Sequence, residues 1–144
     1  MTQHPEESPI HGSVQHLNPE TMHKNPAFTQ AITVTGPTRT IYIGGQDAVD
    51  ADGNIVGKGD LAAQTRQVLK NLRLVLDAAG ARPEHIIKWN IYLVQGQSFQ
   101  AGYEAFQEFW GRQPNPPIIT GMFVAGLAHP DFLVEIDAIA VVPA

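Results

Sequence analysis

Residues 60–79, DLAAQTRQVLKNLRLVLDAA, decide how this chain folds. Their apolar side chains recur at the three- and four-residue spacing of an amphipathic helix, and charged side chains share the other face. Asp60 can cap the first turn, while Gly80 can end the helix in a left-handed conformation shortly before Pro83. A helix with one packed face is therefore predicted, and its inner positions are Leu61, Thr65, Val68, Leu69, Leu72, Leu76 and Ala79.

Short strands are predicted before this helix. Residues 31–34 and 40–43 are rich in β-branched and aromatic side chains, and the Gly36-Pro37 pair between them marks a turn. These two runs predict a hairpin. Residues 54–56 follow a second turn signal and predict one more short strand.

After the first helix, the pattern predicts a strand at 86–94 and a second helix from Ser98 to Gly111, followed by strands at 118–125 and 132–142. The order β-β-(β)-α-β-α-β-β has too few helices for a doubly wound sheet but enough to cover one sheet face. The fold class is therefore an α+β two-layer sandwich. The aromatic row of the second helix predicts core packing, and it consists of Phe99, Tyr103, Phe106 and Trp110.

The last predicted strand suggests self-association. Its alternate residues from Phe132 to Val142 are all apolar, whereas the opposite face mixes carboxylates with aliphatic side chains. The strands at 86–94 and 118–125 also carry large apolar groups on both faces. Since helices cover one face, the other would expose an apolar patch of the kind that marks an interface. The alternative is that loops or the N-terminal segment cover it.

Composition limits the function classes. A chain of 144 residues fits one domain, and we expect a flexible or surface-attached arm at 1–24 before a single domain at 25–144. The net charge of -5 and the scattered basic residues argue against nucleic acid as the main partner. The lack of cysteine favours a reducing compartment, so a cytoplasmic location is expected. Neither a secretory signal at 1–8 nor a membrane-spanning run is expected.

Glu135 is the candidate catalytic residue, and Asp137 is a carboxylate that could act together with it. They lie two apart on a strand, so both carboxylates project from the same face. Desolvation and mutual repulsion would raise one pKa toward neutrality, the condition for accepting a proton from water. The alternative is structural: each carboxylate pairs with an Arg or Lys across the interface or forms hydrogen bonds to backbone.

The six histidines do not predict a metal site. Four of them precede residue 25, while His85 and His129 stand alone, so the ligand spacing of a zinc site is absent. Surface or capping roles are expected, and neither metal nor cofactor is predicted. Gly44-Gly45-Gln46 lacks the further glycines of a phosphate-binding loop and predicts a close approach of backbone instead.

Four segments together resemble the RidA/YjgF family of reactive-intermediate deaminases. The likeness follows the family's order and spacing over about 25–142, in the segments IYIGGQ (41–46), DLAAQTRQVLKNL (60–72), YEAF (103–106) and VEIDAIA (134–140). The resemblance implies a chorismate-mutase-like α+β subunit. It also implies a homotrimer whose sheets form a central barrel, with small-molecule clefts between subunits.

The resemblance also implies a chemistry: hydrolysis of enamine or imine metabolites, such as 2-aminoacrylate, to a keto acid and ammonia. Relatives anchor the substrate carboxylate with the arginine of a Pro-Ala-Arg segment. Here the segment reads Pro117-Ile118-Ile119, so Ile119 stands where the arginine belongs. Arg112 is near in sequence as a substitute anchor. Glu135 matches the family glutamate associated with the water.

The remaining expected substrate-binding positions follow from the same resemblance. Phe28 stands at an aromatic position, Gly44 replaces a serine and Gln100 occurs where asparagine is common. Thr120 and Gly121, next along the strand, complete the set. Two functions stay open: a deaminase-type hydrolase for an imine or enamine other than 2-aminoacrylate, or a non-catalytic metabolite-binding or regulatory trimer.

Overall fold

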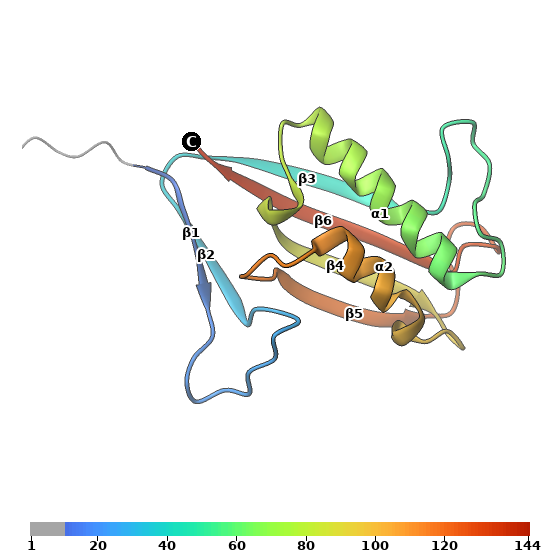
Figure 1. The fold of residues 1–144 in the computed structure, drawn as a ribbon, viewed down its shortest axis with the longest axis horizontal. Coiled ribbons are helices and arrows are strands. Elements are labelled where there is room, and N and C mark those ends of the chain that lie inside the picture. Colours follow the sequence, from blue (N-terminus) through green and yellow to red (C-terminus); the bar gives the residue numbers. More distant parts are fainter. Residues whose placement is uncertain (1–10) are drawn as a thin grey trace, which may run out of the picture.

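The computed structural model describes residues 11–144, which form six strands and two helices with two short 3-10 turns (Figure 1). The strands are β1 (Ser13–Leu17), β2 (Ala31–Thr35), β3 (Thr38–Gln46), β4 (Ile86–Val94), β5 (Ile118–Val124) and β6 (Val134–Pro143). The helices are α1 (Leu61–Ala78) and α2 (Tyr103–Trp110), with 3-10 turns η1 (Pro83–His85) and η2 (Phe99–Gly102).

A four-stranded sheet carries both helices on one face. Its strand order is β3-β6-β4-β5, with β4 and β5 parallel and the other neighbours antiparallel. Both α1 and α2 cross the same side of this sheet in Figure 1. The predicted α+β two-layer architecture is confirmed.

The predicted hairpin is wrong. β2 pairs with β1, from Leu17↔Ala31 to Ser13↔Thr35, while β3 pairs with β6. The physical reason is that β6 offers β3 a long, alternating apolar partner, and the Gly36-Pro37 turn directs the chain from one sheet into the other. β1 and β2 therefore form a separate two-stranded ribbon.

Two further sequence expectations differ from the structure. Residues 54–56 form no strand, because Gly53 and Gly57 both adopt positive φ and only the isolated bridge Val49↔Ile55 remains. The reverse holds for Ser13–Leu17, which we assigned to the arm and which forms β1. Only Val14 and Leu17 are strongly apolar there, so the period-two signal is weak.

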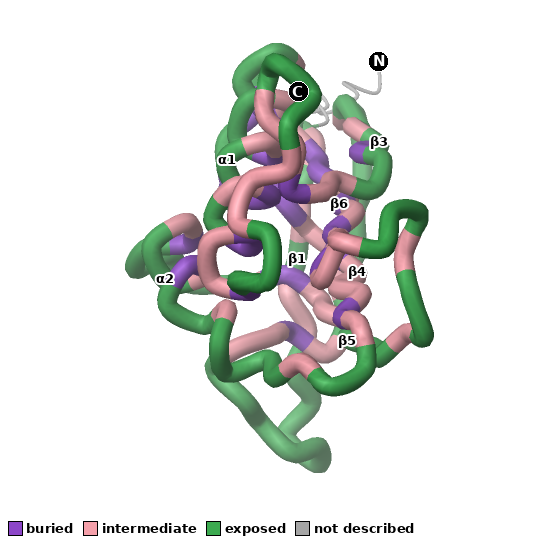
Figure 2. Tube along the Cα trace, turned by 90° about the vertical axis from the view of Figure 1, so that its right-hand side faces the viewer, coloured by how far each residue is buried: buried purple, intermediate pink, exposed green. Residues whose placement is uncertain are grey.

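Helix α1 begins and ends as predicted. The Asp60 carboxylate accepts a hydrogen bond from the Ala63 N–H at 3.1 Å, and Gly80 has φ +69°. The inner face of α1 packs on β6 and β3, and Leu72, Trp89 and Ala140 in the core have no exposed surface. Buried residues accordingly concentrate between the helices and the sheet (Figure 2).

Gln64 fixes the approach to β6. This fully buried α1 side chain donates to Asp131 O at 2.9 Å and to Gly57 O at 3.2 Å, and it accepts from the Leu133 N–H at 2.9 Å. One amide thus joins α1 to two loops. Because Leu133 directly precedes β6, these bonds set where that strand enters the sheet.

The sheet has two unlike faces. The helix face includes Ile43, Trp89, Val134 and Ile136, all buried. The opposite face, here called the open face, includes Tyr42, Tyr92, Met122 and Ile139, among which Tyr42 is 79% exposed. In the described chain no segment covers Tyr42, so the predicted interface remains a prediction. Neither helix of residues 11–144 is long and apolar enough to cross a membrane.

Candidate functional site

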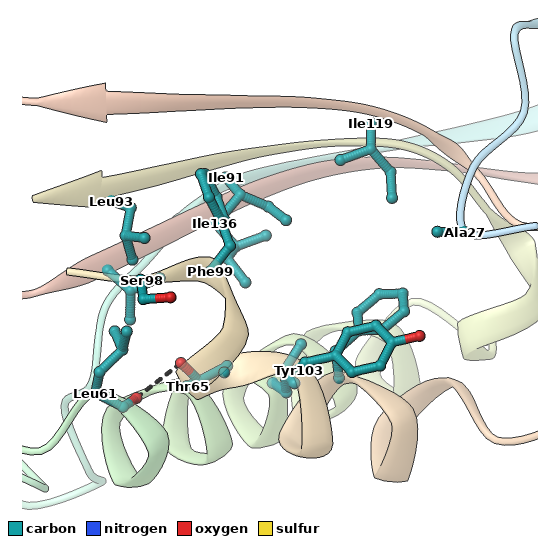
Figure 3. Close-up of a pocket in the computed structure, with 14 residues that line it drawn as sticks. Ala27, Leu61, Thr65, Ile91, Leu93, Ser98, Phe99, Tyr103, Ile119 and Ile136 are labelled. Carbon is teal, nitrogen blue, oxygen red and sulfur yellow. Dashed lines mark hydrogen bonds between the residues drawn. The ribbon is translucent and has the colours of Figure 1, made fainter. Parts of the chain in front are cut away.

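The two strongest site predictions lie on opposite faces of the sheet. Ile119 points from β5 toward the helices (Figure 3). Val134 and Ile136 line the same cavity, and since side chains alternate along a strand, Glu135 between them projects from the open face. One chain therefore does not bring Glu135 and Ile119 together.

Glu135 forms a carboxyl pair with Asp47. Burial, a hydrogen bond to Glu135 and the charge of Glu135, in that order of size, together raise the pKa of Asp47 to about 7. The Glu135 carboxyl group lies close against the backbone of Gly45. A Cβ at position 45 would lie only 2.7 Å from the Glu135 carboxyl carbon, so a residue with a side chain there would displace Glu135. Near neutral pH, a proton held on Asp47 is donated to Glu135, so the pair offers both an acid and a base.

Asp47 is held in place by α1. Asn71 Nδ2 donates to the backbone carbonyl oxygens of Asp47, at 3.0 Å, and of Val49, at 2.9 Å. Asp47 was not predicted, because it follows β3 without a spacing in the sequence that links it to Glu135. The available signal was an acidic residue directly after Gly44-Gly45-Gln46, at the end of a strand.

Asp137 is satisfied by neutral donors from β4. Asn90 Nδ2 donates to one carboxylate oxygen and the Tyr92 hydroxyl to the other, each at 2.8 Å. The hydrogen bond to Asp137 is the main reason that the pKa of Tyr92 is raised. Within residues 11–144 neither Glu135 nor Asp137 pairs with a basic side chain. Ion pairs across a subunit interface therefore stay a prediction, and within the chain the carboxyl partner of Glu135 is Asp47 rather than Asp137.

An apolar cavity of about 180 Å³ lies between the helices and the sheet (Figure 3). Phe99 and Tyr103 stand at its edge and are 41% and 46% exposed, so their predicted core packing is wrong, whereas Trp110 is buried as predicted. The cavity is lined by Ala27, Leu61, Thr65, Leu69, Ile91, Leu93, Ser98, Phe99, Gly102, Tyr103, Phe106, Ile119, Val134 and Ile136.

Three other predicted positions lie around this cavity. Gly121 sits under the Phe99 ring, since a Cβ on it would lie 3.1 Å from that ring's outer carbon. Gln100 is exposed in η2 beside Phe99. Phe28 is half-buried next to Thr29, whose N–H donates to Pro117 O at 3.1 Å, directly before β5.

The last two predicted positions are exposed and lie away from the cavity. Thr120 is on the open face of β5, opposite Asn90 of β4. Gly44 is exposed near the end of β3, where its carbonyl oxygen accepts from Gln46 Nε2 at 3.1 Å. Arg112 is exposed and is not among the residues that line the cavity.

Two histidines have the predicted capping role. His85 Nδ1 accepts from the Arg82 N–H at 2.9 Å, and His129 Nδ1 accepts from the Asp131 N–H at 3.0 Å. His4 lies outside the described residues. In residues 11–144, no three His, Cys, Asp or Glu side chains group as metal ligands would.

The sequence is similar to those of known proteins. The family model described as endoribonuclease L-PSP matches residues 20–142. A RutC family protein of Pyrococcus horikoshii is 36% identical over 100 residues, which cover 69% of this chain and 77% of the relative. A RutC family protein of Synechocystis is 33% identical over 117 residues, which cover 81% and 86%.

Solved structures agree with these matches. A Rid-family protein of unknown function, YyfB from Yersinia pestis, has a TM-score of 0.80 and 35% identity, over 90% of this chain and 98% of that one. TdcF from E. coli, solved with bound serine, has a TM-score of 0.64 and 30% identity, over 71% and 80%. The chain therefore belongs to the RidA/YjgF family and has its chorismate-mutase-like α+β fold.

Proposed function

We propose that this protein is a deaminase-type hydrolase for an imine or enamine metabolite other than 2-aminoacrylate. Family membership supports small-molecule binding, and TdcF, one of the related structures, contains bound serine. The observation that carries the hydrolytic step is the Glu135–Asp47 carboxyl pair, because imine hydrolysis needs both a base for water and an acid for nitrogen.

Glu135 and Asp47 together can carry out every proton transfer that imine hydrolysis requires. Glu135 accepts a proton from water as the water oxygen bonds to the imine carbon. Asp47 gives its proton to the substrate nitrogen, which completes a carbinolamine. Glu135 then returns its proton to that nitrogen while Asp47 takes the hydroxyl proton, so the carbon–nitrogen bond breaks, ammonia and a carbonyl product leave, and both carboxyl groups are back in their starting state. General acid–base catalysis of this kind contributes about 10²- to 10⁴-fold in rate.

The substrate differs from 2-aminoacrylate because the anchor differs. An arginine binds a carboxylate through a planar, bidentate pair of hydrogen bonds, whereas Ile119 offers only an aliphatic surface. A small carboxylate brought to this position would lose its hydration without gaining a partner. We therefore expect weak or no turnover of 2-aminoacrylate, and Ile119→Arg should raise it.

The positions of Glu135 and Ile119 support a cleft that lies between two subunits. Because Glu135 and Ile119 lie on opposite faces of one sheet, a substrate that touches both must sit between two copies. The exposed apolar side chains Tyr42 and Met122 on the open face support such contact. We propose a homotrimer, in which each cleft takes its cavity from one copy and its carboxyl pair from the next.

Ammonia release from an imine formed in situ tests the reaction. Glu135→Gln should abolish release above the buffer rate, and Glu108→Gln, an exposed change on α2, is the matched control. Unchanged release by Glu135→Gln would contradict the proposal. Mixing Glu135→Gln subunits with Ile119→Trp subunits should restore part of the activity, because some clefts then receive both native halves. Failure to restore any activity would contradict the shared cleft.

A non-catalytic metabolite-binding trimer is the second candidate. The observation that favours it is Ile119 itself, since the position that anchors substrate in relatives lacks a charge. In that case the wild type binds ligand without releasing ammonia from it, and Glu135→Gln leaves the affinity unchanged.

A further inference from the structure

The cavity on the helix face differs chemically from the carboxyl pair on the open face. All of the residues that line it are uncharged, and most are aliphatic or aromatic. From the sheet, Ile91, Leu93 and Ile136 point into it beside Ile119, while Tyr103 approaches from α2 (Figure 3). An ion placed here would lose its hydration without a charged partner, so the lining selects against charge.

Two of the three hydroxyl side chains of the lining, Thr65 and Ser98, are engaged in hydrogen bonds within the chain. Thr65 Oγ1 donates to Leu61 O at 2.8 Å, a bond within α1. Ser98 Oγ accepts from the Gln100 N–H at 3.2 Å as the cap of η2. The third hydroxyl belongs to Tyr103 at the exposed edge, so the inner lining offers water few hydrogen-bond partners, and apolar cavities of this size bind apolar molecules.

The size of the cavity limits the occupant. Its volume is about 180 Å³. An apolar protein cavity of about 150 Å³ binds benzene, so one six-membered ring or a branched chain of similar bulk fits here. The half-exposed rings of Phe99 and Tyr103 at the edge leave a route by which such a group can enter.

We propose that this cavity binds the uncharged apolar body of a small molecule, a single ring or branched chain of benzene size. Resting on the function proposed above, this defines the substrate class: imines whose carbon carries such a group and no carboxylate. The reactive carbon–nitrogen bond then lies at the cavity edge, toward the carboxyl pair of a neighbouring copy.

A pair of probes that share one ring tests the binding. Benzyl alcohol and benzoate differ in charge, and titrations followed by NMR on the full chain report the affinity of each without any turnover. We expect benzyl alcohol to bind about tenfold or more tightly than benzoate, because only the anion loses hydration. Equal affinities, or no binding of benzyl alcohol at tens of millimolar, would overturn the proposal.

Variants locate the binding in the cavity. Ile119→Trp fills it from the sheet and Ala27→Phe fills it from the edge, so each should weaken benzyl alcohol binding about tenfold or more. Leu74→Phe is the control, since Leu74 is exposed on α1 outside the lining. Ile119→Arg should reverse the preference toward benzoate. If neither filling variant changes the affinity, the probe binds elsewhere and the proposal is wrong.

Turnover separates this inference from the proposed function. The imine formed by oxidation of benzylamine hydrolyses to benzaldehyde and ammonia, and the protein should accelerate this release above the buffer rate. Tight binding of benzyl alcohol without any acceleration would overturn the hydrolase and leave the cavity assignment standing. Acceleration of a carboxylated imine alone would overturn the substrate class.

Discussion

The two faces of the four-stranded sheet have different roles, and alternate residues of one strand belong to different faces. On β6, Val134 and Ile136 face the helices and are almost fully buried, whereas Glu135 and Asp137 face away and are half-buried among polar groups. The helix face gains its stability from apolar area removed from water. The open face of β6 instead carries the two carboxyl groups and their hydrogen bonds to Asp47, Asn90 and Tyr92. Substitutions on one face of β6 should therefore affect the core without changing the candidate site, and the reverse. Four substitutions test this separation of the two faces.

Trp89→Ala should have the largest effect, because it empties the centre of the helix face. The ring has no exposed surface and lies 5.1 Å from the Phe106 ring and 5.8 Å from the Phe109 ring, centroid to centroid. We expect the free energy of unfolding to fall by about 3–5 kcal/mol in urea titrations. Leu74→Ala, on the exposed side of α1, should change it by only about 0.5 kcal/mol or less. If Trp89→Ala lowered the free energy of unfolding no more than Leu74→Ala does, the helix face would not be the main source of stability.

Gln64→Leu should follow, because it removes the amide that joins α1 to both loops. The substitution leaves the Leu133 N–H and the Asp131 carbonyl oxygen without the partner that Gln64 supplies, whereas the Gly57 carbonyl oxygen keeps the Asp60 N–H as a donor. The expected loss is about 2–4 kcal/mol in the same titrations, since each buried group left unpaired costs about 1–3 kcal/mol and water reaches some of them. Lys70→Gln, an exposed change on the same helix, serves as the control. A neutral result would mean that β6 enters the sheet independently of Gln64.

Asp47→Asn should alter the dependence of stability on pH. Because the pKa of Asp47 is raised to about 7 in the fold, its contribution to stability is complete below its unfolded pKa of 3.8 and disappears as pH rises through about 7. The lowered pKa values of His16 and His85 act the other way, since their contribution is lost as pH falls. The difference in melting temperature between wild type and Asp47→Asn therefore isolates the carboxyl. The variant should gain relative to wild type from pH 4 to pH 8, and a constant difference would contradict the raised pKa.

Tyr42→Asp should have the smallest effect on the subunit's own fold. The side chain is 79% exposed on the open face, so its removal costs little within one chain. If copies associate through this face, however, the buried negative charge should shift the mass measured by light scattering from trimer toward monomer. Leu74→Asp, equally outside the core, should leave the mass unchanged. An unaltered trimer in Tyr42→Asp would place the interface elsewhere.

The sequence predicted the elements whose local signals agree with their surroundings. The periodicity and caps of α1, the strand at 86–94 and the alternation of β6 all have a buried face that the pattern records. It failed for the pairing of β2, because alternation says that a segment is a strand and not which strand it joins. It also failed for β1, where an exposed ribbon needs few apolar side chains.

The candidate site was predicted only in part. The likeness to the family identified Glu135 and the change at Ile119, yet it gave no indication of Asp47, whose approach to Glu135 depends on the irregular end of β3 and on Asn71. Contacts between segments so far apart in sequence have no local pattern. Phe99 and Tyr103 were predicted to be buried for a related reason. Helical spacing shows that they share one face with Phe106 and Trp110, but it does not show that the sheet ends before it covers them.

The separate ribbon of β1 and β2 has a kinetic consequence. Two strands alone are marginally stable in water, and Val34 in β2 is 41% exposed. Its backbone amides should exchange with deuterium through local opening, well before those of β4 and β6 at the centre of the sheet. The ribbon would then open and close as an independent unit while the four-stranded sheet, the cavity and the carboxyl pair stay folded.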